Sequence, residues 1–237
     1  MSEWKQKRFW TKVDVVTVED GFAVQLDGRG VKTPAKASLV LPTKALADAV
    51  AAEWEAQEDE VNPNLMPFTR SANAAIDKVS IQHGEVADML AAYGDADMLC
   101  YRASDPVELV ERQTQQWDPV LAWAATELGA QLEIRKGIMH VAQAEEPLKN
   151  LSDRTHAFSN FELAAFHDLV SLSGSLILGF AAAYDAVPVE EIWLKSRLDE
   201  LWQEEQWGPD EEAQETSDVK KASFLHAKSF FDASQTG

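Results

Sequence analysis

The stretch "DGFAVQLDGRG", residues 20–30, has the alternation of a short strand held between two tight turns. Phe22, Val24 and Leu26 recur at every second position, so they lie on one face of an extended chain. The Asp-Gly pairs at 20–21 and 27–28 favour hairpin turns, because these residue types tolerate positive φ. Residues 13–41 are therefore predicted to form an antiparallel meander.

Two helices are predicted after this meander. Thr43 is a good N-cap for the first helix, whose apolar face is expected to pack on the sheet. Its apolar positions recur at i, i+4 and i+8 and are Leu46, Val50 and Trp54, all expected in the core. A second helix follows Pro67 and carries its apolar stripe on Phe68, Ala72, Ile76 and Val79.

The rest of the chain has mainly helical periodicity. Helices are expected over 83–93, 106–128, 160–184 and 188–207, with Ser159 and Glu162 forming a capping box before the third. Leu132 and Ile134 alternate ahead of Gly137, which favours a short hairpin within 130–143. The last residues, 229–237, are expected to fray.

These patterns together predict an α+β fold with two domains. Residues 1–80 are expected to form a small N-terminal antiparallel sheet with helices on one face. Residues 81–237 are expected to form a larger, all-α orthogonal bundle domain with an acidic end that carries tryptophan.

The charge balance excludes several classes of partner. The chain has 21 Lys+Arg and 40 Asp+Glu in 237 residues, a net charge of −19. Such a chain repels phosphate backbones and anionic lipid, so neither nucleic acid nor a membrane surface is an expected partner. The single cysteine, Cys100, cannot form an internal disulfide and is expected to be a buried thiol in a reducing compartment. No export signal is visible at the N-terminus.

The motifs of common enzymes are missing from the sequence. "GRGVKT" at 28–33 has the letters of a phosphate-binding loop in the wrong order, and we interpret it as a turn. No two of the five histidines have the spacing of metal ligands on a helix, and no serine lies in a G-x-S-x-G elbow. We therefore assign no catalytic residue, cofactor or metal.

One stretch, "LDELWQEEQWGPDEEA" at 198–213, combines tryptophan with dense acidic charge. Trp202 continues the stripe of Leu194, Leu198 and Leu201 and is expected in the core, whereas one or both of Trp193 and Trp207 are expected to be partly exposed. Such a run is either a solvated acidic face or a binding patch with aromatic anchors. The residues alone leave both alternatives open.

Eight segments in order resemble the ATP synthase assembly factor 2 family. They are "RFW" (8–10), "AAEWEAQ" (51–57), "MPFTRSANAAIDKV" (66–79), "DMLCYRA" (97–103), "WDPVLAW" (117–123), "GIMHVAQ" (137–143), "SGSLILGFA" (173–181) and the acidic stretch at 198–213. The resemblance implies a non-catalytic chaperone that binds the unassembled α subunit of the F-type ATP synthase catalytic head, prevents its aggregation and releases it to the β subunit. It also implies an N-terminal α/β domain and a C-terminal helical domain.

On this basis we expect the partner to contact the acidic end. The expected residues there are Trp207, Asp210 and Glu211, with Glu204 and Glu212 beside them. Arg70 and Asn73 lie off the apolar stripe of their helix, and they either contact the partner or cap the neighbouring domain. We expect a protein that is monomeric when free and located in the bacterial cytoplasm, or in the mitochondrial matrix for a processed eukaryotic member.

Two other functions are alternatives to the chaperone interpretation. A small hydrolase-type enzyme would have an acidic cleft between sheet and bundle, with Asp, His and Arg converging in a deep pocket. A permanent structural subunit would expose a larger apolar interface and would be insoluble or oligomeric alone.

Overall fold

The computed structural model describes residues 7–137 and 139–235, and the chain divides into two compact units. The first unit takes its described residues from 1–83, 159–165 and 229–237, and the second from 84–158 and 166–228. Residues 1–6, 138 and 236–237, which fall within the predicted N-terminal segment, the predicted hairpin and the predicted frayed end, lie outside the described residues. The domain boundary predicted at residue 80 stays a prediction.

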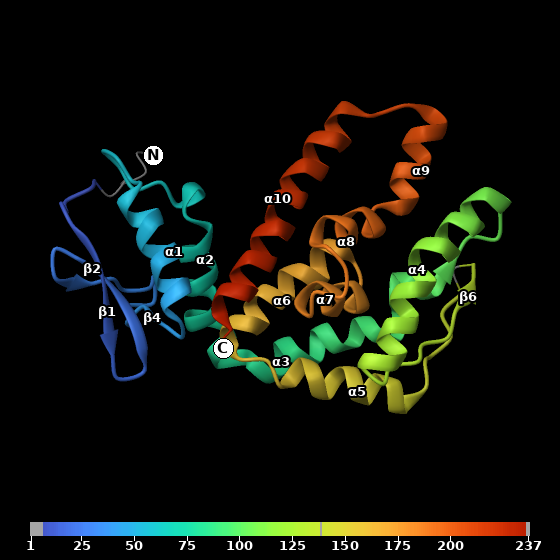
Figure 1. Cartoon of the computed structure of the whole chain (residues 1–237), viewed down its shortest axis with the longest axis horizontal. Helices are drawn as coiled ribbons and strands as arrows, with labels where there is room; N and C mark the ends of the chain where they lie inside the picture. The colour runs from blue at the N-terminus through green and yellow to red at the C-terminus, as the bar shows by residue number, and fades with distance from the viewer. Residues whose placement is uncertain (1–6, 138, 236–237) are drawn as a thin grey trace. The chain divides into compact units, whose positions relative to one another are not determined.

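The first unit contains the predicted antiparallel sheet (Figure 1). Its central strand is β2 (Gly21–Leu26), which pairs with β1 (Val13–Val18) along its whole length. The short strands β3 (Arg29–Gly30) and β4 (Val40–Leu41) also pair with β2 in antiparallel register. The α+β fold with a small N-terminal sheet is therefore confirmed.

One of the two hairpin turns differs from its prediction by one residue. The first turn is Glu19–Asp20, because Gly21 is already paired with Val18 in the ladder. A Cβ atom on Gly21 would lie 2.3 Å from the carbonyl oxygen of Leu41, so β4 approaches β2 too closely for any other residue. The second turn is the predicted Asp27–Gly28 pair, and both residues have positive φ.

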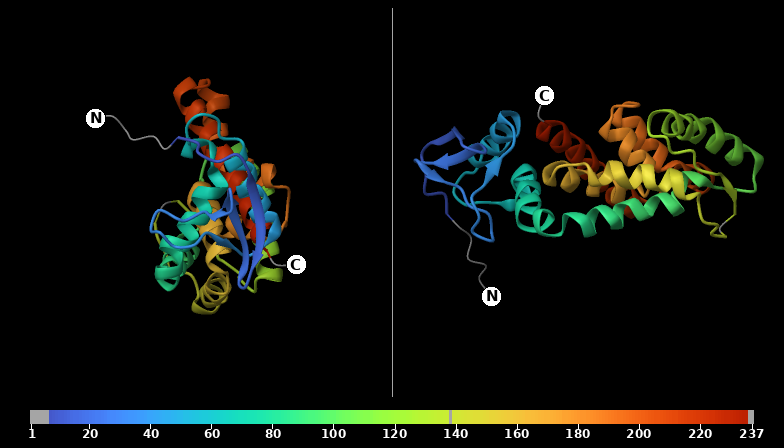
Figure 2. Two further views of the ribbon diagram at one scale, coloured as in Figure 1. Left: turned by 90° about the vertical axis from the view of Figure 1, so that its left-hand side faces the viewer. Right: turned by 90° about the horizontal axis from the view of Figure 1, so that it is seen from below.

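Helix α1 (Lys44–Glu55) packs on β1 and β2, and Figures 1 and 2 show it against the sheet. Thr43 caps it as predicted, accepting a hydrogen bond from the amide of Leu46 at 3.1 Å. Leu46 and Val50 are buried. Trp54 corrects the prediction, because it lies at the edge of this core: it is half-buried and contacts Trp10 edge-on at 5.3 Å.

The second predicted helix contains a wider turn. Helix α2 (Pro67–Ala74) continues through a π-helical turn, Ala75–Val79, into α3 (Ser80–Ala91). A π-helical turn contains one residue more than an α-helical turn. The stripe of buried residues therefore shifts to a different position on the helix surface at this point. Gln82 has non-helical backbone dihedrals (φ −123°, ψ 28°), so α3 is kinked there and the helical run expected from His83 follows the kink.

The second unit is built around the buried helix α7 (Leu176–Ala183), in which every residue is buried. The single helix predicted over 160–184 was wrong. Gly174, with φ of 72°, ends α6 (Asn160–Ser173), and Ser175 caps the separate α7 by accepting the amide of Leu178. The capping box of Ser159 and Glu162 is present in both directions.

Two further predictions about the second half were wrong. The helix predicted over 188–207 is broken at Arg197 into α8 (Val189–Ser196) and α9 (Leu198–Trp207). The end of the chain does not fray within its described residues, because α10 (Glu211–Ser234) continues to Ser234 and buries Phe230 and Phe231.

The remaining elements of this unit include one that the sequence did not predict, α5 (Glu145–His156). Helix α4 (Val107–Glu127) has the predicted extent. In place of the hairpin predicted at 130–143, strand β6 (Arg135–Lys136) pairs in parallel with β5 (Tyr101–Arg102). Short helical turns occupy Ala92–Ala96 and Met98–Cys100 in this unit and Pro63–Leu65 in the first unit. None of the helices among the described residues has the length and hydropathy that crossing a membrane requires.

Candidate partner-binding site

The acidic, tryptophan-bearing segment lies where α9 turns into α10 (Figure 1). Helix α9 ends at Trp207 because Gly208 follows with φ of 93°, and Pro209 cannot continue a helix by donating an amide. The chain then reverses through Pro209 and Asp210 into α10. We name residues 204–212 the acidic tip.

Asp210 has a structural task in the tip. Its Oδ1 accepts hydrogen bonds from the amides of Glu212 at 3.0 Å and Ala213 at 3.2 Å, so it is the N-cap of α10. Glu211 and Glu212 follow in the first turn, where the helix dipole favours negative charge. Part of the acidic composition therefore stabilises the start of α10, while all three side chains stay exposed.

The three tryptophans near this end lie in different environments. Trp193 is buried and contacts Phe224 at 5.6 Å. Trp202 corrects the prediction of a core position, because it is half-buried under the guanidinium of Arg112, 4.8 Å from its ring centroid. Trp207 is 85% exposed. Of these three, Trp207 is the ring available to a partner.

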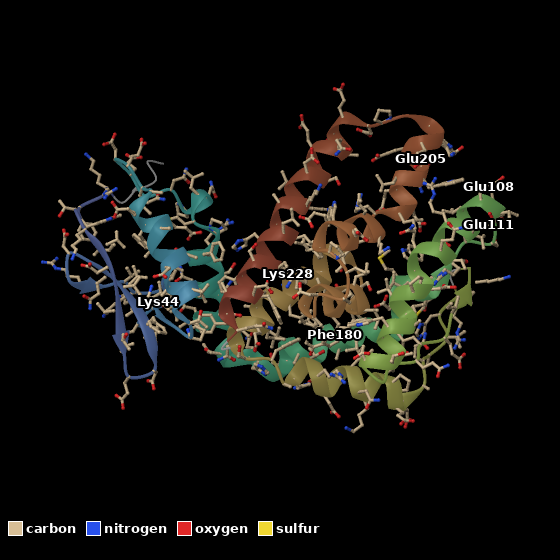
Figure 3. All side chains as sticks on the ribbon, in the orientation of Figure 1. Lys44, Glu108, Glu111, Phe180, Glu205 and Lys228 are labelled. Atoms are coloured by element: carbon tan, nitrogen blue, oxygen red, sulfur yellow. The ribbon has the colours of Figure 1, made fainter. Side chains whose placement is uncertain are left out.

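The tip is held in place through α9. Arg112 on α4 donates two hydrogen bonds of 2.8 Å to the carboxylate of Glu205. The side chains of Gln113 and Asp199 join the same two helices at 2.8 Å. Figure 3 shows Glu205 facing the first turns of α4, where Glu108 and Glu111 project. Arg112 therefore links α9 to α4 at a place where several acidic side chains lie close together. Its hydrogen bonds to Glu205 lower the pKa of that carboxyl.

A hollow of about 340 Å³ lies beside the tip. Its α10 wall is made of small side chains, Ala213, Thr216 and Ser217, and its rim carries both signs of charge on Asp210 and Lys220. The other lining residues are Arg197 and Glu212. The small side chains leave space on the exposed side of α10 that a partner's side chain can enter.

Arg70 and Asn73 lie on α2 in the first unit, whereas the acidic tip belongs to the second unit. Arg70 is exposed. Asn73 is half-buried, and its Oδ1 is buried without a hydrogen-bond partner among the described residues. Their assignment to partner binding stays a prediction.

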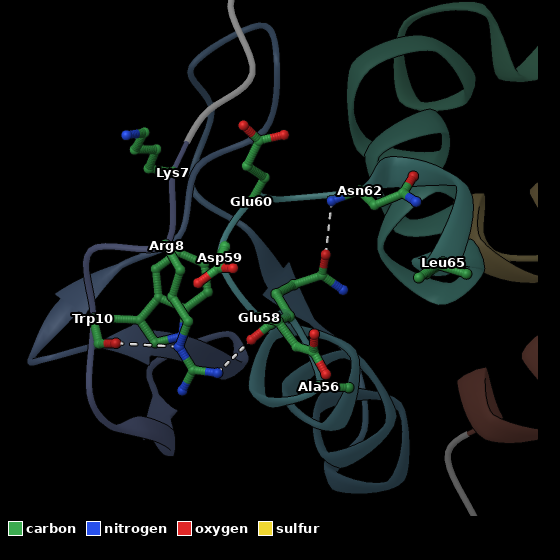
Figure 4. Close-up of a pocket in the computed structure, with 10 residues that line it drawn as sticks. Lys7, Arg8, Trp10, Ala56, Glu58, Asp59, Glu60, Asn62 and Leu65 are labelled. Carbon is green, nitrogen blue, oxygen red and sulfur yellow. Dashed lines mark hydrogen bonds between the residues drawn. The ribbon is translucent and has the colours of Figure 1, made fainter.

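A larger hollow, of about 1090 Å³, lies in the first unit around Arg8 (Figure 4). The guanidinium of Arg8 donates to the carbonyl oxygens of Trp10 at 3.2 Å and Glu55 at 2.9 Å, and to that of Gln57. These bonds join the "RFW" segment to the end of α1. Arg8 therefore has a structural role that the sequence motif did not reveal.

Comparison with known proteins identifies the family. The model of the ATP12 chaperone protein family matches residues 7–125, about half of the chain. The chain belongs to the ATP12 chaperone family.

Solved structures agree with this assignment over nearly the full length. The crystal structure of Atp12 from Paracoccus denitrificans is 45% identical and has a TM-score of 0.96, covering 98% of this chain and 100% of that one. A structure from Agrobacterium tumefaciens is 42% identical with a TM-score of 0.92, covering 97% of this chain and 86% of that one. The mitochondrial protein atp12 of Schizosaccharomyces pombe is 27% identical over 221 residues, 88% of this chain and 76% of the relative.

Membership in the ATP12 chaperone family confirms the expected class of protein. The chain is a chaperone rather than the hydrolase considered as an alternative. Two contacts that orient the tip escaped the sequence reasoning. Arg112 pairs with a residue 93 positions away, and the capping role of Asp210 depends on where α10 begins.

Proposed function

We propose that this chaperone binds the unassembled α subunit of the F-type ATP synthase catalytic head through its acidic tip, prevents aggregation of that subunit and releases it to the β subunit. The free chaperone is a monomer. It acts in the bacterial cytoplasm, or in the mitochondrial matrix if the chain is a processed eukaryotic protein.

The observation that carries this proposal is Trp207, whose ring is 85% exposed at a position fixed by the Arg112–Glu205 pair. Tryptophan is a common anchor of protein interfaces, and exposing it in the free protein has no structural benefit here. The acids around it supply a charged rim, which accelerates association and orients the partner more than it adds affinity.

A small interface suits a chaperone that must release its client. Subunits that alternate in a ring expose apolar faces until they assemble, and those faces promote wrong association. A contact with one aromatic anchor and an acidic rim shields such a face reversibly, and the β subunit can displace it.

The test mixes the chaperone with refolded α subunit from the same organism in the absence of β subunit. Light scattering reports aggregation, and size exclusion reports a complex. Suppressed scattering and coelution that β subunit reverses are expected. Unchanged scattering with no coelution would overturn the proposed function.

Variants then locate the contact. Trp207→Ala is expected to weaken the complex about ten-fold or more, as hot-spot truncations do. Asp210→Asn keeps an N-cap while removing charge, and together with Glu211→Gln it is expected to slow association more than it speeds dissociation. Glu215→Gln, an exposed acid of α10 outside the tip, is the matched control. Wild-type binding by all tip variants would reject this site.

A further inference from the structure

Strand β6 belongs to a connecting segment that we name the strap, residues 132–137 and 139–143. Its backbone is held by contacts within the strap and with neighbouring elements. Within the strap, the Gln143 side chain donates to the carbonyl oxygen of Glu133 at 3.0 Å and accepts the Glu133 amide at 2.8 Å. The amide of Gln143 donates to Asp95 Oδ1 at 2.7 Å. Leu132 is buried, and β6 pairs with β5.

His140 is a further fastening point near the middle of the strap. Its Nε2 lies 3.3 Å from Asp95 Oδ2, and its Nδ1 is 3.1 Å from the hydroxyl of Tyr101. Asp95 thus holds the strap through both carboxylate oxygens. The course of the strap is set by these polar contacts together with the buried side chain of Leu132.

Three apolar side chains of the strap remain in solvent. Met139 is 77% exposed, and Val141 and Ile134 are about half exposed. Burial of such side chains would be favourable, at about 25 cal/mol per Å². The fold holds the backbone of this segment in place and nevertheless leaves them exposed. Clustered exposed apolar side chains on a fixed segment are typical of an interaction surface.

The strap also departs from the charge of the whole chain. The chain carries a net charge of −19, whereas the strap carries Arg135 and Lys136 against Glu133, which is 2 − 1 = +1. Lys136 is exposed and forms no ion pair within the described part of the chain. Lys136 lies in β6 and Ile134 directly precedes that strand, and side chains two residues apart along a strand point to the same face.

The edge of β6 that faces away from β5 has no strand paired with it in the described chain. Within the described chain its sheet has two strands, so β6 has β5 as its one strand neighbour. An edge strand presents unpaired amide and carbonyl groups, and peptides bind such edges in extended form, with alternate side chains setting specificity.

We propose that the strap binds an extended segment of the chaperone's client, the unassembled α subunit, that pairs with the free edge of β6. The segment places an apolar side chain against Ile134 and an acidic side chain against Lys136, while Met139 and Val141 contact its apolar flank. This inference rests on the proposed function and adds to it a second contact of opposite charge from the acidic tip. A client that binds both contacts must carry a basic region and an acidic, apolar strand.

Photocrosslinking tests the placement directly. A benzophenone amino acid is introduced at Met139, and as a matched control at Ile81 on α3, which is equally exposed at 77%. Each labelled chaperone is irradiated with α subunit. A crosslinked product from position 139, at least about five times more abundant than from position 81, is expected, with the attached client peptide in an acidic, apolar stretch.

Substitutions measure the contribution of the strap. Lys136→Glu and the pair Met139→Asp with Val141→Asp are each expected to weaken the complex about five- to ten-fold, and Ile81→Asp is expected to leave it unchanged. A thermal melt of each variant separates loss of binding from loss of folding, and the crosslinking result stands if a variant does not fold.

The outcomes separate this proposal from the proposed function. A wild-type chaperone that binds α subunit, without a crosslink at 139 and with normal binding by the folded strap variants, would overturn the strap contact alone. Loss of binding after Trp207→Ala together with unchanged binding after Lys136→Glu would limit the client to the tip. A wild-type chaperone that fails to bind α subunit would overturn both proposals.

Discussion

Asp97 and Asp210 are both aspartates that accept backbone amides where a helix begins, and they differ in their surroundings. Asp97 is fully buried and accepts the amides of Leu99 and Ile177, each at 3.0 Å, and the hydroxyl of Ser175 at 2.8 Å. Asp210 accepts the amides of Glu212 and Ala213 in full contact with water.

The surroundings decide what each carboxylate can be used for. Burial raises the pKa of Asp97, and the hydrogen bonds from the protein oppose that shift. Because Asp97 is buried, water cannot replace a donor that is lost there. The hydrogen-bonded carboxylate of Asp97 is therefore needed for the stability of the second unit. The carboxylate of Asp210 keeps free lone pairs toward solvent, so the same capping chemistry leaves it available to a partner.

The largest effect is expected at Cys100, which lies in the same core as Asp97. Burial, and then the negative charge of Asp97, raise the pKa of the thiol from its usual 9.0 to about 12. Three pKa units lower the thiolate fraction near neutral pH about a thousand-fold, so the native thiol is expected to react with a disulfide reagent at least that much more slowly than the unfolded thiol. Native and urea-unfolded labelling rates measure this, and a native rate within ten-fold of the unfolded one would contradict it.

Asp97→Ala is expected to lower the free energy of unfolding by about 3 kcal/mol, because it leaves the buried Ile177 amide and Ser175 hydroxyl without their acceptor. Urea denaturation followed by circular dichroism measures the change. Ser175→Ala removes one donor to Asp97 and the cap of α7, and it is the partial control. A midpoint for Asp97→Ala equal to that of the wild type would show that the buried carboxylate is not needed.

Asp210→Ala is expected to cost about 1 kcal/mol of helix stability, the usual loss of an N-cap. The loss stays within the first turns of α10, since residues 211–216 are exposed. Helical ellipticity should therefore fall slightly while the urea midpoint barely changes, and Asp210→Asn should restore it. A midpoint shift as large as that of Asp97→Ala would remove the contrast between the two aspartates.

The smallest effect is expected from the exposed pair of Arg112 and Glu205. The hydrogen bond from Arg112 lowers the pKa of Glu205 below its usual 4.5. The contribution of this ion pair to the free energy of unfolding is therefore fully present above pH 4.5. It is lost as the pH falls through the lowered pKa that Glu205 has in the folded protein. The difference in thermal midpoint between wild type and Glu205→Gln should shrink in acid and in high salt. A difference that grows under either condition would contradict the pairing.

The sequence predicted those features that depend on neighbours in the chain. Thr43 caps α1, Asp27 and Gly28 form a turn, and α4 spans nearly the residues expected. Local propensity and periodicity decide such features. The family resemblance, carried by short segments in order, also predicted the chaperone class.

The errors arose where a contact distant in sequence decides the outcome. Apolar periodicity continues across Gly174 and Ser175 and therefore predicts one helix where the structure has α6 and α7. The residue that hydrogen-bonds Ser175 at this break is Asp97, which lies 78 residues away. Alternation around β6 predicts a hairpin with the residues that follow it. The pattern contains no sign that Tyr101–Arg102, distant in sequence, is the strand that pairs with β6. In the site, the exposure of Trp207 followed from its position before Gly208, whereas the half-burial of Trp202 depends on Arg112.

Helix α10 has a further consequence for how the chaperone moves. Its residues 211–216 lie in solvent, whereas Phe224, about two turns further along, is fully buried against Trp193. The front of the helix can unwind and rewind in a fraction of a microsecond without disturbing that contact, because helix elongation takes nanoseconds per residue. For a client bound at the tip as proposed, release would need only the opening of a few turns of α10, so the time for which the client stays bound would be separate from the lifetime of the folded chaperone.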